Sequence, residues 1–223
     1  MEPSTTQRLG RRERPAANPS APDGLLVLLH GRGANADDLF PLLEHFDPDA
    51  RLHGVTLEAP YVPQGQFGHH WYVVHRVGFP HEETFTTSLR LLEQDVDALL
   101  AEHGLTHDRL VIGGFSQGAV MSIATALGAG RPRPAAVIPW SGFVPTVDGW
   151  ELGADTAQDV PVLLAHGTFD PVITIDFAHD AKARLEAAGA AVEFHEVPMQ
   201  HEIDPESIVR ARELILDVVP ARS

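Results

Sequence analysis

Short apolar segments alternate with segments of helical periodicity along most of the chain, and this alternation constrains the fold more than any other feature. Six apolar runs have the length and flanking residues of buried strands: 24–31, 51–60, 109–115, 134–142, 160–167 and 190–198. Helices are predicted at 34–46, 87–104, 116–128, 176–188 and 205–217. Strands that alternate with helices in this way indicate an α/β fold, with a mostly parallel central sheet flanked by helices on both faces.

The length of the chain is typical of one domain. A chain of 223 residues with 43% hydrophobic residues can form one α/β domain with a full core, and it is short for two. Residues 1–22 are polar and rich in Pro and Arg, which predicts a disordered tail before a single domain over residues 23–223. The sheet and helices leave no room for a large cap domain. The irregular stretches at 61–84 and 143–159 are therefore expected to form the walls of any pocket.

Charge and composition exclude several classes of function. The formal net charge of -15 repels nucleic-acid backbones and anionic lipids, so a small-molecule partner is expected and a nucleic acid is not. The absence of cysteine excludes disulfides, thiolate metal sites and a cysteine nucleophile. No apolar segment reaches the length of a membrane span, and the first residues contain no secretory signal, so we expect a cytoplasmic protein.

A G-x-S-x-G sequence at residues 114–118 stands between a predicted strand and a predicted helix. In this context the motif predicts a nucleophile elbow, in which a sharp turn presents the hydroxyl of Ser116 at the start of the helix. Glycine and serine are common, so a simple packing turn is the alternative interpretation. A serine hydroxyl also requires a base and an acid that orients that base.

Two later strand ends provide such an acid and base. Asp170 follows the predicted strand 160–167, and His201 follows the predicted strand 190–198. The order Ser116, Asp170, His201 is the order of the α/β-hydrolase triad. His166 is the main rival to His201 as the base, but it precedes the acid and is interpreted as holding the turn.

A glycine-rich loop follows the first predicted strand, in the sequence LLHGRGAN. We expect the backbone N–H of Arg32 in this loop, together with that of Gln117 after the nucleophile, to form an oxyanion hole. An ordinary strand-to-helix turn is the alternative interpretation of these glycines. The histidines at 69, 70, 75 and 81 match no known ligand spacing, so no metal site is expected.

Taken together, these residues resemble the phospholipase/carboxylesterase family, the small serine hydrolases that include acyl-protein thioesterases. The resemblance covers nearly the whole chain after the tail. It is carried by LLHGRGANADDL, GFSQGAVMS, HGTFDPVI and PMQHEI. It implies an α/β-hydrolase fold without a large lid, the triad and oxyanion hole named above, and a possible homodimer. The chain differs from many members at Arg32 and at the sequence Trp71-Tyr72-Val73, two places expected to touch the substrate pocket.

The expected reaction is hydrolysis of short-to-medium acyl esters by a serine carboxylesterase, through an acyl-enzyme and without a metal or organic cofactor. Four aromatic residues are candidates for the acyl pocket, although each could equally belong to the core: Trp71, Phe79, Phe143 and Trp150. A lysophospholipase or an acyl-protein thioesterase with the same mechanism is the alternative. A non-catalytic binding protein with the hydrolase fold is a more remote one.

Overall fold

The computed structural model describes residues 8–62, 64–65 and 67–222. Within these residues a central sheet has seven strands in the order β1-β3-β2-β6-β7-β8-β9, and all neighbours are parallel except β1 and β3. The strands are β1 (Arg11–Arg14), β2 (Leu25–Leu29), β3 (His53–Leu57), β6 (Leu110–Phe115), β7 (Ala136–Trp140), β8 (Pro161–Gly167) and β9 (Ala191–Val197). Each of the six predicted strands is present, and the predicted mostly parallel central sheet is confirmed.

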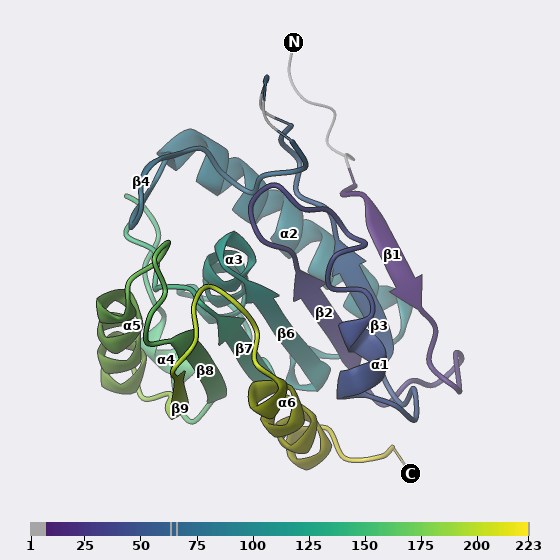
Figure 1. Cartoon of the computed structure of the whole chain (residues 1–223). Coiled ribbons are helices and arrows are strands. Elements are labelled where there is room, and N and C mark those ends of the chain that lie inside the picture. The colour runs from purple at the N-terminus through teal and green to yellow at the C-terminus, as the bar shows by residue number, and fades with distance from the viewer. Residues whose placement is uncertain (1–7, 63, 66, 223) are drawn as a thin grey trace.

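Helices cover both faces of this sheet (Figure 1). They are α1 (Leu42–Phe46), α2 (Glu82–Glu102), α3 (Gln117–Leu127), α4 (Ala154–Ala157), α5 (Ile175–Ala187) and α6 (Pro205–Val218), with a short 3-10 turn, η1 (His107–Arg109). Helix α1 is shorter than predicted and begins after Pro41, a residue that the interior of a helix does not accommodate. Helix α2 begins earlier than predicted, with Glu82 and Glu83 in its first turn, where carboxylates favour the helix dipole.

Alternate residues of the strands enter two separate hydrophobic clusters, one on each face of the sheet. In β2, Leu25, Val27 and Leu29 pack on one side, whereas Leu26 and Leu28 pack on the other. The first cluster also contains side chains from α2, α3 and α5, and the second contains side chains from α1 and α6. In Figure 1, α1 and α6 lie in front of the sheet, and α2 and α3 lie behind it.

The expectation of a disordered tail over residues 1–22 is wrong for residues 8–22, and residues 1–7 lie outside the described residues. Strand β1 pairs antiparallel with β3 at the edge of the sheet. Leu9 is buried, and its N–H donates to Oδ2 of Asp95 at 2.7 Å. The sequence of β1, RRER, contains no apolar residue. The strand is held at the edge of the sheet by its backbone pairing and by ion pairs such as that of Arg14 with Asp47.

The two stretches expected to be irregular each contain a regular element. Within 61–84, β4 (Val74–Arg76) and β5 (Phe79–Pro80) form a small antiparallel hairpin. Within 143–159, the short helix α4 forms. Elements of two to four residues have too little periodicity to be identified from sequence. Within the described residues no separate cap domain covers the sheet, and Figure 1 shows β4 apart from the central strands.

The packing of Leu9 gives a direct test of the ordered N-terminal segment. Leu9 is 6% exposed, so Leu9→Ala should lower the free energy of unfolding by about 2–3 kcal/mol, the usual cost of such a cavity. Leu216→Ala, at a leucine that is 46% exposed, is the matched control and should change stability by less than about 0.5 kcal/mol. Urea denaturation measures both. Equal, small effects would show that residues 8–22 do not pack on the domain.

Candidate active site

The turn between β6 and α3 places Ser116 in a strained backbone conformation. Ser116 has φ 55° and ψ -116°, and α3 begins at the next residue. Non-glycine residues rarely adopt such angles unless the surrounding structure enforces them. Here the helix lies so close to β2 that a Cβ on Gly118 would stand 2.0 Å from the carbonyl oxygen of Leu29. The glycines of the motif therefore serve close packing, and the packing places the serine side chain at the start of α3.

Asp170 and His201 meet beyond the carboxyl ends of β8 and β9. Nδ1 of His201 lies 2.6 Å from Oδ2 of Asp170. Oδ1 of the same carboxylate accepts the N–H groups of Val172 and Ile173, each at 2.8 Å. Because a carboxylate accepts hydrogen bonds, Nδ1 of His201 carries the proton and Nε2 is left as a proton acceptor. The pair has the arrangement of an acid that orients a base.

Gly167 allows the loop with His201 to cross the end of β8. A Cβ on Gly167 would stand 2.2 Å from the carbonyl oxygen of Gln200. The ring of His201 also packs against Phe115, with ring centroids 4.6 Å apart. The imidazole is therefore located by backbone contact, by a hydrogen bond and by an aromatic neighbour.

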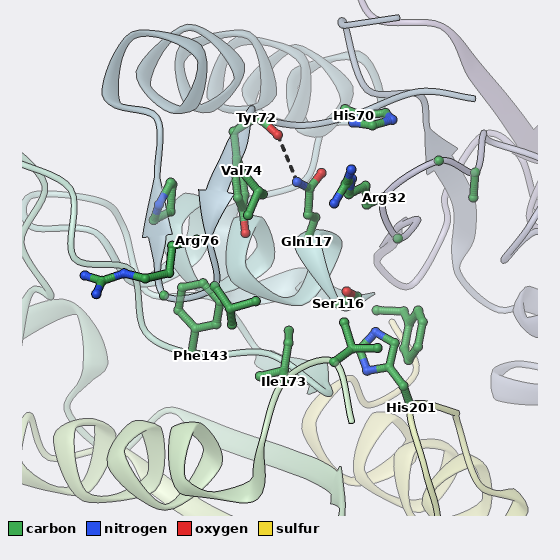
Figure 2. Close-up of a pocket in the computed structure, with 18 of the residues that line it drawn as sticks. Arg32, His70, Tyr72, Val74, Arg76, Ser116, Gln117, Phe143, Ile173 and His201 are labelled. Carbon is green, nitrogen blue, oxygen red and sulfur yellow. Dashed lines mark hydrogen bonds between the residues drawn. The ribbon is translucent and has the colours of Figure 1, made fainter. Parts of the chain in front are cut away.

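Ser116 and His201 lie beside one another at one end of a cavity of about 700 Å³ (Figure 2). Other predicted site residues, Arg32, Gln117, Phe79 and Phe143, line the same cavity. Its remaining wall is mostly apolar and includes Val74, Val77, Pro80, Val172 and Ile173. A cavity of this size can enclose a small-molecule substrate. The structure thus brings the serine, the histidine and an apolar chamber together.

Two of the four aromatic candidates for the acyl pocket, Trp71 and Trp150, are not among the residues that line this cavity. Trp71 is fully buried, and its indole N–H donates to the carbonyl oxygen of His30 at 2.8 Å. Trp150 packs on α3, and its indole N–H donates to the carbonyl oxygen of Ala124 at 3.2 Å. Each indole satisfies its N–H against backbone in the domain interior or at its edge, so neither ring is available as a wall of the substrate cavity.

Gln117 ties the loop around Trp71 to the serine turn through its side chain. Its amide oxygen accepts the N–H of Trp71 at 3.0 Å, and its amide nitrogen donates to the carbonyl oxygen of Tyr72 at 2.9 Å (Figure 2). The backbone N–H of Gln117 is in the first turn of α3, where helix geometry provides no partner within the helix. Gln117 also lines the cavity beside Ser116, so its backbone N–H stays the candidate for an oxyanion donor.

His30 was not identified from the sequence, although it directly precedes the glycine loop. Its Nδ1 donates to the carbonyl oxygen of Gly31 at 2.7 Å, and its Nε2 accepts the N–H of Ala59 at 3.1 Å. The carbonyl of Gly31 and the N–H of Arg32 belong to one planar peptide and point in opposite directions. By holding the carbonyl, His30 fixes the direction of the Arg32 N–H.

The histidines at 69, 70, 75 and 81 serve separate local contacts. His69 Nδ1 donates to the carbonyl oxygen of Ala59 at 2.8 Å, and the rings of His75 and His81 contact each other. Across the part of the chain that the structure describes, no group of three or more possible ligands could hold a metal ion. Over the same residues, no helix has both the length and the apolar character needed to cross a membrane.

The family model described as Phospholipase/Carboxylesterase matches residues 16–218. The chain belongs to this family. It is therefore an enzyme, a carboxylic ester hydrolase.

Individual relatives cover nearly the full chain at low identity. Acyl-protein thioesterase 1 of Debaryomyces hansenii is 26% identical, over 92% of this chain and 96% of the relative. Lysophospholipase-like protein 1 of Mus musculus is 22% identical, over 89% of this chain and 88% of the relative. Among solved structures, esterase PE8 superposes with a TM-score of 0.81 at 27% identity, covering 95% of this chain and all of the other. The Bacillus cereus carboxylesterase, with a TM-score of 0.79 at 23% identity and 94% of each chain covered, shares the fold.

The buried position of His30 predicts a pH-dependent stability. Burial lowers the pKa of His30 to about 4, below the value of an exposed histidine. In the unfolded protein His30 binds a proton at higher pH than in the folded protein. The contribution of the neutral His30 to the free energy of unfolding is therefore complete above about pH 6.5 and decreases toward pH 4. The free energy of unfolding should fall by about 2–3 kcal/mol over that range from His30 alone.

The variant His30→Gln removes the titrating group and keeps an amide oxygen that can accept the N–H of Ala59. Urea denaturation from pH 7 to pH 4 should show a shallower decline in this variant than in the wild type. His45→Gln, at an exposed histidine of α1, is the matched control and should reproduce the wild-type decline. Parallel curves for all three proteins would contradict the assignment of His30 as a buried neutral imidazole.

Proposed function

We propose that the protein is a serine carboxylesterase with Ser116 as nucleophile, His201 as general base and Asp170 as the acid that orients it. The hydrogen bond between His201 and Asp170 carries the proposal, because it fixes the proton on Nδ1. The imidazole then presents its basic Nε2 on the side of the cavity that Ser116 lines. The strained turn at Ser116 adds support, since such strain is typical of a presented nucleophile.

The reaction proceeds in two steps. Ser116 attacks the acyl carbonyl as His201 removes its hydroxyl proton, and the backbone N–H groups of Arg32 and Gln117 stabilise the oxyanion. The imidazolium returns the proton to the leaving alcohol, which breaks the ester bond and leaves the acyl group on Ser116. Water then attacks this acyl-enzyme with His201 again as base, releasing the carboxylic acid and restoring the serine. These steps use the chain's own groups.

The preferred substrates in this proposal are esters of short-to-medium acyl chains. The apolar wall formed by Val74, Phe79 and Phe143 suits an aliphatic chain. A thioester or a lysophospholipid would use the same residues, and the names of the relatives from Debaryomyces hansenii and Mus musculus favour these as alternative substrates. The chemistry at Ser116 is common to all of them, so the acyl group and the leaving group distinguish the alternatives.

The nucleophile can be tested by covalent labelling. A fluorophosphonate probe should label the wild-type protein, and Ser116→Ala should abolish this labelling. The same substitution should lower kcat for ester hydrolysis by roughly a thousandfold or more. Ser122→Ala is the matched control on the same helix, since the hydroxyl of Ser122 donates to the carbonyl of Ala119 and lies outside the cavity lining. Labelling that persists in Ser116→Ala would overturn the assignment.

The substrate preference can be tested with nitrophenyl esters from butyrate to laurate, which keep the leaving group constant. We expect kcat/KM to be highest between butyrate and octanoate and to fall roughly tenfold or more at laurate, which corresponds to about 1.4 kcal/mol of lost transition-state binding. Phe143→Ala removes a ring from the apolar wall and so enlarges the cavity. It should move the optimum of kcat/KM to longer acyl chains. A wild-type preference for laurate over butyrate would contradict the short-to-medium range and favour the lipid alternatives.

A further inference from the structure

The buried histidine near the end of β8, His166, contacts the proposed acid without taking part in the proposed proton transfers. Its Nε2 lies 2.8 Å from the carbonyl oxygen of Ile173. Because a carbonyl only accepts hydrogen bonds, Nε2 carries a proton and donates it. The same nitrogen lies 3.4 Å from Oδ2 of Asp170. The N–H of Nε2 is thus bonded to a loop carbonyl, and the carboxylate lies close enough to interact with it electrostatically.

The other ring nitrogen of His166 shows that this imidazole is neutral. Nδ1 is buried and has no hydrogen-bond partner among the described residues, so a proton there would be an unsatisfied buried donor. Burial lowers the pKa of His166, opposed by the hydrogen bond to Ile173 and the charge of Asp170 and assisted by the charges of His201 and His179. A neutral His166 donates a hydrogen bond and leaves the negative charge of Asp170 available to His201.

Contacts from four groups locate the Asp170 carboxylate. Oδ1 accepts two backbone N–H groups of the loop that follows it, from Val172 and Ile173. Oδ2 receives the Nδ1–H of His201 and lies 3.4 Å from Nε2 of His166. The loop bonds hold one oxygen, whereas the second oxygen depends on the two imidazoles. Since His201 must exchange protons during the proposed reaction, His166 is the neighbour of Oδ2 that keeps the same protonation state throughout.

We propose, on the basis of the triad proposed above, that His166 is a positioning residue. Its Nε2–H holds the Ile173 carbonyl by a hydrogen bond and stabilises the nearby Asp170 carboxylate electrostatically, in the arrangement that orients His201. It acts through Asp170 and does not touch the substrate, because it is fully buried and does not line the cavity. The contact with Ile173 extends this role to the pocket, since the side chain of Ile173 lines the cavity. His166 therefore links the acid to the wall against which the acyl group would lie.

The test compares two substitutions that neither titrate nor carry charge. In His166→Gln the amide nitrogen can occupy the position of Nε2 and donate, whereas His166→Leu fills similar space without a donor. With nitrophenyl butyrate, His166→Leu should lower kcat about tenfold or more with KM changed by less than about twofold. His166→Gln should recover kcat to within about threefold of the wild type. It should also keep the pH dependence of kcat/KM, because a neutral His166 does not titrate in the working range.

A spectroscopic signal separates positioning from a general loss of packing. The short hydrogen bond between His201 and Asp170 should give a far-downfield proton resonance in protein labelled with ¹⁵N-histidine. This resonance should be present in the wild type and in His166→Gln, and it should be lost or broadened in His166→Leu. If His166→Leu does not fold, His166→Asn replaces it, because its shorter amide occupies the position of Nδ1 and cannot reach Asp170.

Three results would overturn the proposal: wild-type kcat in the variant without a donor, equal losses in both variants, or an unchanged downfield resonance without the donor. Fluorophosphonate labelling of the wild type distinguishes these results from failure of the proposed function. Labelling that depends on Ser116, together with full activity in His166→Leu, would reject the role of His166 alone. Hydrolysis that persists in Ser116→Ala would reject the triad itself.

Discussion

The contact between Gly118 at the start of α3 and the carbonyl of Leu29 in β2 is the constraint on which the site depends. It brings the helix against two neighbouring strands, and only a residue without a Cβ allows this approach. The turn at Ser116 must then be tight, which accounts for its positive φ. Because the strands are parallel, the loops after β2, β8 and β9 emerge at the same edge as this turn. The positions of Arg32, Asp170 and His201 follow from that shared edge.

Two buried histidines connect these loops to the sheet by the same physical means. His30 and His166 each donate from one ring nitrogen to a loop carbonyl, and burial lowers the pKa of both. A neutral imidazole is suited to such a position, since it supplies a directed N–H without adding a charge beside the reacting groups. His201 differs because it lies at the cavity and faces a carboxylate. The hydrogen-bond partners therefore divide these three histidines into two kinds: two that hold loop carbonyls and one that faces the carboxylate.

The fold and the proposed catalytic residues could be predicted from the sequence because the relevant signals are local. A buried strand, a G-x-S-x-G turn and a helix are adjacent in the chain, and the order of the later polar residues was sufficient to select Asp170 and His201. Strand β1 could not be recognised, since its sequence shows no apolar alternation and its pairing uses the backbone. The choice between pocket and core could not be made for Trp71 and Trp150 from the sequence, because the side on which a ring packs depends on contacts distant in sequence, such as those with His30 and Ala124.

The loops around the cavity are held by contacts with each other and with the domain. The hairpin β4–β5 contributes Phe79, which is 53% exposed and lies under the guanidinium of Arg76 at 3.6 Å. Two contacts hold the turn of this hairpin. The hydroxyl of Thr146 donates to the carbonyl oxygen of Gly78 at 2.9 Å, and the ring of Phe177 lies against Gly78. The two walls expected from the sequence are therefore joined to each other and to α5. Because the interior of a protein is close-packed, a change in one wall would be felt in the other, so a substitution at a single aromatic residue of the cavity would also alter the loop that it contacts.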